Sequence, residues 1–438
     1  MSKLAIFGGE PAVKNKSDDI FMRNITKEME DAVLDVLHQW KMSSFDITKE
    51  FEKAFADWHK MKYGLGCNNG TSALHCAMYG AGIGVGDEII CQSTTYWASC
   101  LPVFSLGGTV VFADIDPETL CIDPDDIEHR ISGKTKAIMV VHYAGMPADM
   151  DRIMPIARKY NLKIIEDVSH SHNCLYKGKM VGTFGDVSGF SLMSGKSFAV
   201  GEAGIMLTDD RDIYERALLF GHYERHSEII NPELQKLSGL PWGGYKYRMH
   251  QMSSAIGLVQ IKQFQKDMVE IDKAMNYFWD ILEGYPGIKA HRPPKNSGST
   301  KGGWYCSLGL YKTEELEGLS ITRFCEALRA EGVGCSYPGC NRPLHIHPVF
   351  NDVDIYGHGK PTRIVNATRD VREKTGSLPN AEALQKRVFG VPWFRHYWPE
   401  RIEEYANAFK KVIENYKELL QGDTGDPEEL GGWHLSKR

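Results

Sequence analysis

The segment Phe190-Ser-Leu-Met-Ser-Gly-Lys-Ser-Phe-Ala-Val-Gly-Glu-Ala-Gly204 places one lysine, Lys196, among small and apolar residues. Residues 185–190 before it and residues 205–208 after it have the composition of short strands. We therefore expect Lys196 on a short loop between two strands, which is an unusual place for a long cationic side chain.

The sequence neighbours of this lysine are Met193, Phe198 and Val200, whereas a solvated lysine usually has polar neighbours. Partial burial would lower the pKa of the Lys196 amine from about 10.4, because desolvation disfavours the ammonium form. A neutral amine is a nucleophile that can form a Schiff base. The alternative is a hairpin lysine that reaches solvent, and this segment alone does not decide between the two.

Upstream of this segment, strands and helices alternate. The apolar patterns predict strands at 63–68, 88–91, 109–113, 137–141 and 162–166, with helical stretches at 71–79, 96–106, 125–131 and 149–160 between them. Such alternation favours an α/β fold with a mostly parallel sheet covered by helices on both faces. Ligands of such sheets bind at the carboxyl ends of the strands.

Three groups of polar residues follow predicted strands: Tyr96, Asp167 and the turn Gly70-Thr71-Ser72. The turn opens a helix, and a helix N-terminus with hydroxyl side chains is a natural anion site. Alternatively, Thr71 or Ser72 only caps that helix. Asp167 either caps the next turn or faces a bound cationic group, with His170 fixing its geometry.

Beyond residue 208 the pattern predicts further elements: helices at 212–220, 251–265, 268–282, 322–331 and 401–420, and strands at 303–310 and after 332–336. Residues 351–380 are polar and irregular, which is typical of an insertion or a flexible loop. We predict a large domain over residues 1–270, a smaller α+β domain over 271–420, and a polar, disordered tail over 421–438.

Composition excludes several classes of protein. The net charge of −6 gives no electrostatic case for nucleic-acid binding, and no apolar run approaches the ~20 residues of a membrane span. The ten cysteines contain no C-x-x-C pair, and the N-terminus lacks a signal-peptide pattern, so we expect a reduced, cytoplasmic protein without a metal site.

Eight short motifs occur in one order along the chain. They are Asn69-Gly-Thr-Ser-Ala-Leu, Gly86-Asp-Glu-Ile-Ile, Thr95-Tyr96, Asp114-Ile-Asp-Pro, Glu166-Asp-Val-Ser-His, Phe190-Ser-x4-Lys196, Gly201-Glu-Ala-Gly and Gly244-x3-Arg248-Met. Over roughly residues 5–420 the chain resembles the DegT/DnrJ/StrS family of aminotransferases, which use pyridoxal 5′-phosphate (PLP). The resemblance implies the fold-type-I architecture, with a mostly parallel sheet of the seven-stranded type in the large domain. It also implies a homodimer with shared active sites and a role in amino-sugar biosynthesis.

The resemblance assigns roles to the candidate residues. Lys196 would hold PLP and shuttle a proton, and Asp167 would pair with the pyridine nitrogen. Tyr96 would stack on the ring and His170 would support it. The PLP phosphate would be held by the hydroxyls of Thr71, Ser72 and Ser191 and by Lys246 of a partner subunit. Arg248 and His345 are candidates for contacts with the substrate.

Two departures from the family pattern stand out. Lys246 replaces the usual asparagine, and Gly201-Glu-Ala-Gly replaces Gly-Glu-Gly-Gly. Lys196 argues against those relatives that carry histidine at this position and act as dehydratases. The expected function is transfer of an amino group from L-glutamate or L-glutamine to a keto-sugar, possibly nucleotide-linked, or a ketocyclitol. A PLP-dependent sugar dehydratase and a non-catalytic sugar-binding regulator are the alternatives.

Overall fold

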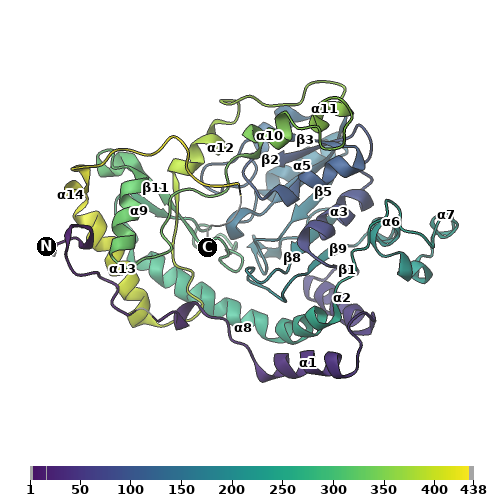
Figure 1. Cartoon of the computed structure of the whole chain (residues 1–438), viewed down its shortest axis with the longest axis horizontal. Coiled ribbons are helices and arrows are strands. Elements are labelled where there is room, and N and C mark those ends of the chain that lie inside the picture. The colour runs from purple at the N-terminus through teal and green to yellow at the C-terminus, as the bar shows by residue number, and fades with distance from the viewer. Residues whose placement is uncertain (1–2, 16, 434–438) are drawn as a thin grey trace.

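In the computed structural model, strands alternate with helices along the chain and form a seven-stranded sheet (Figure 1). The structure describes residues 3–15 and 17–433. The strand order is β1-β9-β8-β5-β4-β2-β3. The bounds are β1 Tyr63–Cys67, β2 Glu88–Gln92, β3 Thr109–Ala113, β4 Thr135–Val141, β5 Lys163–Asp167, β8 Val187–Ser191 and β9 Gly204–Thr208. The α/β expectation is confirmed, and only β9 runs against the other strands.

Helices surround this sheet, and those from residue 70 onward begin and end close to the predicted residues. The helices are α1 Lys27–His38, α2 Asp46–His59, α3 Gly70–Gly80, α4 Pro124–Arg130, α5 Met150–Tyr160 and α6 Arg211–Gly221. The stretch predicted as a helix at 96–106 is instead a pair of 3₁₀ helices, Trp97–Ser99 and Leu101–Leu106. Helix α3 packs directly on β8: a Cβ at Gly189 would lie 2.7 Å from the Leu74 side chain, so only glycine allows this close approach.

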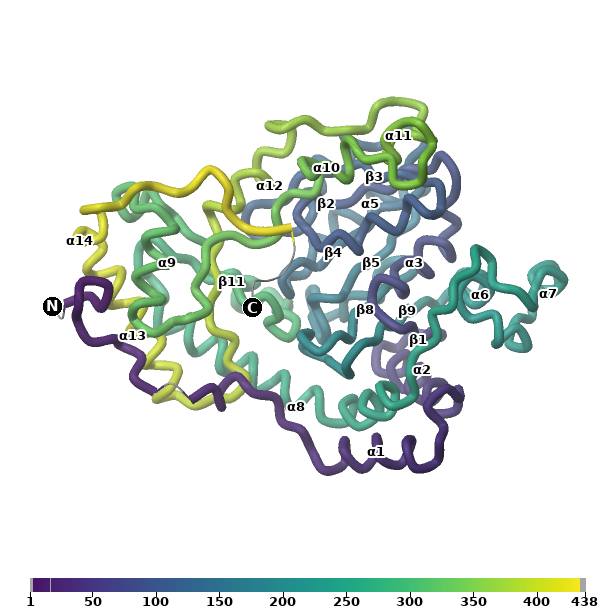
Figure 2. The backbone as a smooth tube through the Cα atoms, viewed as in Figure 1, coloured from purple at the N-terminus to yellow at the C-terminus, as the bar shows by residue number. Residues whose placement is uncertain are grey.

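One long helix, α8 (Gln251–Ile281), replaces the two helices predicted at 251–265 and 268–282. Nothing in residues 266–267 breaks the helical pattern, so the chain continues without interruption. Figure 2 shows α8 running along one side of the molecule, from α1 and α2 at one end to α13 (Pro399–Glu414) at the other. The proposed domain boundary at residue 270 falls inside this helix.

The C-terminal part carries a small antiparallel sheet, β10-β11-β12. Its elements are β10 Ile288–Ala290, β11 Leu308–Tyr311, β12 Val388–Gly390, α9 Ile321–Ala330, α13 Pro399–Glu414 and α14 Tyr416–Leu420. The strand predicted at 303–310 begins only at Leu308, because Trp304 and Cys306 have left-handed backbone angles, with φ of 55° and 51°. The strand predicted after 332–336 is reduced to an isolated bridge between Pro338 and Phe389.

The N-terminal residues contact the C-terminal part of the chain, although the sequence assigned them to the first domain. Glu331 is fully buried and accepts backbone N–H bonds from Ala5 at 2.7 Å and Ala12 at 2.9 Å. It also pairs with Lys411 of α13 at 2.9 Å. One carboxylate therefore holds the N-terminal segment, α9 and α13 together.

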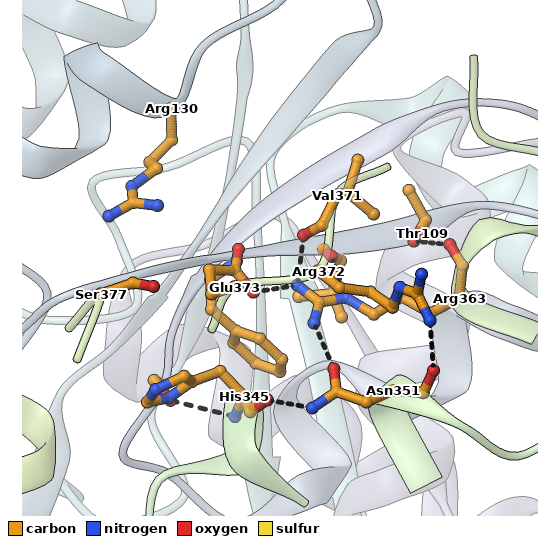
Figure 3. Close-up of polar contacts among 12 residues, drawn as sticks. Thr109, Arg130, His345, Asn351, Arg363, Val371, Arg372, Glu373 and Ser377 are labelled. Atoms are coloured by element: carbon orange, nitrogen blue, oxygen red, sulfur yellow. Dashed lines mark hydrogen bonds and ion pairs between the residues drawn. The ribbon is translucent and has the colours of Figure 1, made fainter. Parts of the chain in front are cut away.

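Residues 352–378, which we call the strap, belong to the stretch expected to be an insertion or a flexible loop, and side-chain contacts anchor them. They lie against β3, the edge strand of the large sheet (Figure 3). Arg363 is fully buried, its Nε donates to the Val110 carbonyl, and its guanidinium pairs with Glu373. Glu373 in turn accepts the Phe112 N–H at 2.9 Å. The Glu373 carboxylate and the Arg363 guanidinium thus satisfy backbone hydrogen-bonding groups on the side of β3 that has no neighbouring strand.

At the opposite edge of the sheet, side chains likewise bond to backbone groups of the edge strand β1. Glu52 of α2 accepts the Gly66 N–H at 2.7 Å, and the His222 ring bonds to the Gly66 carbonyl at 2.9 Å. Glu52 is itself buried and paired with Arg225 at 2.7 Å.

The tail from residue 421 is ordered up to residue 433, contrary to expectation, and residues 434–438 lie outside the described chain. Asp423 accepts both the backbone N–H and the hydroxyl of Ser320 at the start of α9, at 2.8 and 2.6 Å. Asp426 bonds to Thr322 in the same turn. These carboxylates lie at the positive end of the α9 dipole, which favours the contact. The remaining short elements are β6 Leu175–Tyr176, β7 Lys179–Met180, α7 Pro232–Gln235, α10 Pro348–Asn351, α11 Thr362–Val365 and α12 Pro379–Ala383.

Candidate active site

A cavity of about 310 Å³ opens at the carboxyl ends of β5 and β8, next to the N-terminus of α3. It meets the expectation that ligands of such sheets bind at strand ends. Six of the predicted site residues line it: Thr71, Tyr96, Asp167, His170, Ser191 and Lys196. Sequence reasoning missed Thr95, Ser99, Ser169, Glu202 and Tyr305, which also line it.

Lys196 lies on the loop between β8 and β9, which we call the lysine loop (residues 192–203), and is only 6% exposed. Its Nζ lies 4.2 Å from the centroid of the Tyr305 ring. Among the described residues the amine makes no hydrogen bond or ion pair. Burial lowers the pKa of Lys196 to about 8, although Cys306 and Asp167 act in the opposite direction. The predicted burial is confirmed, and a pKa of about 8 leaves a sizeable fraction of the amine neutral near physiological pH.

Asp167 ends β5 and is held by two donors. Its Oδ2 accepts the Ser99 hydroxyl at 2.7 Å, and its Oδ1 accepts the Ser169 N–H at 3.0 Å. Ser99 is held in turn by Thr95, at 2.9 Å between the hydroxyl oxygens. Ser99 follows Tyr96 by one helical turn, so the sequence could have predicted that both residues face the same cavity. Asp167 therefore both caps the next turn and faces the cavity.

His170 does not fix the geometry of Asp167, as the sequence suggested it could. Its Nδ1 accepts the Ala144 N–H at 3.3 Å, which leaves the ring proton on Nε2. Burial lowers the pKa of His170 well below its ordinary value, and the positive charges of Lys196 and Lys301 act in the same direction. The ring is thus neutral and packs 4.8 Å from the Tyr305 ring.

The N-terminus of α3 forms the polar end of the cavity. The helix cap is Asn69, not Thr71 or Ser72: its Oδ1 accepts the Ser72 N–H at 2.8 Å. The Ser72 hydroxyl bonds to Asn68 and Asn69 and does not line the cavity, whereas Thr71 and Ser191 do. Because no helical turn precedes residues 70 and 71, their amides have no intrahelical acceptor.

Besides Ser72, three predicted residues are not brought to this cavity within one chain. Lys246 and Arg248 both pair with Glu224, at 3.3 and 3.6 Å, and the Lys246 side chain is half exposed. His345 is fully buried between the Ser93 hydroxyl, at 2.7 Å, and Glu382, at 3.0 Å. It is a packed histidine that links the loop before Tyr96 to α12.

Tyr305 is the most informative of the missed residues. The segment that carries it turns sharply, since Gly303, Trp304 and Cys306 all have positive φ. A bulky residue in this region is strained and needs support from its surroundings. The Trp304 indole supplies it by donating to Asp272 of α8 at 3.0 Å. Two strained residues therefore place the Tyr305 ring between Lys196 and His170.

A profile of the DegT/DnrJ/EryC1/StrS aminotransferase family matches residues 23–410, and those residues include all ten predicted site positions. The chain belongs to this family. Family membership makes it a PLP-dependent aminotransferase, as the resemblance implied.

Individual DegT/DnrJ/EryC1/StrS proteins support the assignment. The GDP-perosamine synthase of Escherichia coli O157:H7 is 37% identical over 334 residues, covering 74% of this chain and 86% of that protein. The putative L-glutamine:3-amino-2,3-dideoxy-scyllo-inosose aminotransferase of Micromonospora echinospora is 28% identical, covering 94% and 97%. The solved aminotransferase of Psychrobacter cryohalolentis superposes with a TM-score of 0.76 at 26% identity, covering 90% and 98%.

The side chains of the cavity fit the PLP cofactor of this family. A helix N-terminus with the hydroxyls of Thr71 and Ser191 suits a phosphate group. Tyr96 offers an aromatic ring, Asp167 a carboxylate and Lys196 a desolvated amine in the same cavity. Within residues 3–15 and 17–433, no three His, Cys, Asp or Glu side chains gather as a metal site would require. Across the same residues no helix is both long and apolar enough to cross a membrane.

Proposed function

We propose that this aminotransferase moves an amino group from L-glutamate or L-glutamine to the keto group of a sugar, possibly nucleotide-linked, or of a cyclitol. The observation that carries the proposal is the burial of the Lys196 amine in one cavity with Asp167 and the hydroxyls of Thr71 and Ser191. The names of two relatives, one a GDP-sugar synthase and one an L-glutamine:inosose aminotransferase, support the two substrate classes.

Each side chain has a defined task in this proposal. PLP supplies an electron sink that stabilises negative charge at the substrate carbon next to nitrogen. Lys196 would hold the cofactor and would carry the proton at that carbon, a task for which a pKa of about 8 is well suited. Asp167, held by Ser99, would pair with the ring nitrogen of the cofactor, and Tyr96 and His170 would support its ring. Ser72 supports the phosphate site through Asn69 and not by direct contact.

We extend the proposal to a cytoplasmic homodimer. Lys246 and Arg248 lie outside the cavity of their own chain and share Glu224. In a dimer they would reach the cavity of the second copy, where Lys246 would meet the cofactor phosphate as a point charge. The division into domains 1–270 and 271–420 also stands as a proposal, with α8 shared between them.

The first experiment is an absorption spectrum of the purified protein supplied with PLP, beside Lys196→Ala. We expect a band near the edge of the visible range that changes when L-glutamate or L-glutamine is added and is missing in the variant. Amine transfer to a panel of nucleotide-linked keto-sugars and ketocyclitols then identifies the acceptor. No band in either protein would overturn the proposal, whereas a band that ignores every amino donor would favour the dehydratase alternative.

A further inference from the structure

A second cavity of about 310 Å³ lies behind the lysine loop, on the side away from the active-site cavity. Its walls come from the segment before α1, from α8 and from the residues after β12, and Figure 2 shows the N-terminal segment passing along α8 on its way to α1. Ser194, Ser197 and Gly201 of the lysine loop form one wall. The two cavities thus share this loop.

Two arginines face this second cavity without a counter-ion. Arg23 donates through Nη1 to the Ser197 carbonyl at 2.9 Å, but its Nη2 is buried and has no hydrogen-bond partner among the described residues. Arg395 stacks on the Trp393 ring at 3.8 Å, and no carboxylate of the described chain lies within 4.0 Å of its guanidinium. Burial and the charge of Arg23 lower the pKa of Arg395 to about 9, although Asp267 acts in the opposite direction. Two like charges are therefore held together in a partly dehydrated space.

One carboxylate in the same cavity is also unpaired. Asp267 of α8 is half-buried, and burial together with Glu270 raises its pKa. Neither arginine is within ion-pair distance of it, and no side chain in the described residues donates to it. The other acid of the lining, Glu270, is engaged by His396 at 3.4 Å and by the Tyr397 N–H. The cavity therefore holds positive and negative groups that interact across its space but are not in ion-pair contact.

Much of the remaining wall is apolar, beside the polar side chains of Asn24, Gln260 and His396. The apolar part is contributed by Met29, Ile256, Phe264, Met268 and Ile271. A complementary ligand carries an oxyanion for the arginines, a cation for Asp267 and a small body that tolerates an apolar surround. A volume of about 310 Å³ is at the lower end of ligand cavities, which suits a small molecule.

We propose that this second cavity binds a small zwitterion, by its chemistry an α-amino acid. Its carboxylate lies against Arg23 and Arg395, and its ammonium lies against Asp267. Charge-assisted hydrogen bonds of this kind are roughly twice as strong as neutral ones, so both charged groups of the ligand contribute to affinity. Because Arg23 also holds Ser197, the residue after Lys196, a ligand here braces the lysine loop from behind.

The test is calorimetric titration of PLP-loaded protein reduced with borohydride, so that the active-site cavity is filled and cannot react. The probes are single amino acids, beginning with L-glutamate, L-glutamine and L-leucine. Matched analogues lacking the ammonium group (4-methylpentanoate for leucine) or the carboxylate (isopentylamine) are run beside them. We expect one-to-one binding of an amino acid, weakened about tenfold or more in each analogue.

Arg395→Gln and Asp267→Asn test the two ends of the ligand separately, and each is expected to weaken binding about tenfold or more. Arg152→Gln, on the distant helix α5, is the matched control and leaves binding unchanged. The proposal is overturned if no probe saturates below about 10 mM. It is also overturned if an amino acid still binds as tightly after both substitutions. A third contrary result is that 4-methylpentanoate, which lacks the ammonium group, binds as tightly as leucine. The site does not depend on the proposed function: if PLP is not bound, the same titration is run on the protein as purified.

Discussion

Burial of Lys196 costs the folded chain stability at neutral pH, because its ammonium form loses hydration. The folded pKa is about 8 and the ordinary value is 10.5. Below pH 8 the lysine is charged in both states and the cost is complete. Between pH 8 and 10.5 the unfolded chain alone keeps the proton, so stability rises with pH, and above 10.5 the cost is gone.

Replacing this lysine by methionine is therefore expected to stabilise the cofactor-free protein. The gain is about 3 kcal/mol below pH 8 and shrinks toward zero as the pH approaches 10.5. Urea unfolding at a series of pH values measures it, with Lys386→Met, at an exposed position, as the control. A destabilised variant, or a gain that does not change with pH, contradicts the burial argument.

Tyr305 is expected to set the reactivity of the lysine amine through the face of its ring. The cation–π contact at 4.2 Å favours the ammonium form by ~0.5–2 kcal/mol. Tyr305→Leu removes the aromatic face, so the pKa of Lys196 falls and its acylation at pH 7 becomes severalfold faster. Tyr305→Phe retains the face and should react as the parent does. Mass-spectrometric labelling rates measure both, and equal rates in all three proteins would refute this role.

Among single residues, the sequence predicted those site residues that lie at the ends of strands or helices. Lys196, Asp167, Thr71 and Ser191 lie at or just beyond strand or helix ends, where polar residues among apolar runs are conspicuous. Tyr305 was not predictable, because nothing in its neighbours announces the left-handed turn that carries it. His345 misled for the opposite reason: its sequence resembled a pocket residue, yet its partners Ser93 and Glu382 bury it.

Among the elements, the strap makes the clearest energetic prediction. Glu373 neutralises the fully buried Arg363 and also accepts the Phe112 N–H of β3. Glu373→Ala leaves a buried charge uncompensated, which costs about 3–5 kcal/mol in comparable ion pairs. Chemical denaturation should show that loss, while Glu314→Ala, at an exposed position, should be neutral. A loss below about 1 kcal/mol, the range of surface pairs, would mean that the strap is dispensable.

The order of the elements was largely predictable, whereas their exact limits were not. Alternating apolar runs specify the parallel sheet, since each buried strand must be followed by a covering helix. The strap eluded prediction because its contacts are long-range: Arg363 and Val110 are far apart in sequence, and polar composition alone suggests solvent. The contacts of the tail were missed for the same reason. Asp423 and Asp426 accept hydrogen bonds from Ser320 and Thr322, about a hundred residues earlier in the sequence.

Over the whole molecule, Glu331 joins the N-terminal segment to the C-terminal part. Glu331→Ala removes the acceptor of the Ala5 and Ala12 amides and leaves Lys411 unpaired. We expect the segment before Ile20 to detach and become sensitive to trypsin at Lys14, with little change in the sheet. Limited proteolysis followed by mass spectrometry detects this. Unchanged protection of Lys14 would show that the segment is held by its buried apolar residues alone.

The proposed dimer predicts complementation between two defective subunits. Lys196→Ala damages a chain's own cavity, whereas Lys246→Ala would damage the cavity of its partner. Mixed after unfolding and refolding together, the two inactive proteins should regain about a quarter of the parent activity, because half of the dimers are mixed and each mixed dimer contains one intact site. Activity that remains at the background of the two variants refutes the shared site.

Both ends of the seven-stranded sheet are terminated by a paired acid and base, Glu373 with Arg363 at β3 and Glu52 with Arg225 at β1. Side chains thus occupy backbone positions that another strand would need. The sheet cannot be lengthened by adding a strand from a neighbouring molecule, which is the common first step toward fibres. The width of this large sheet is therefore fixed within each subunit before subunits meet.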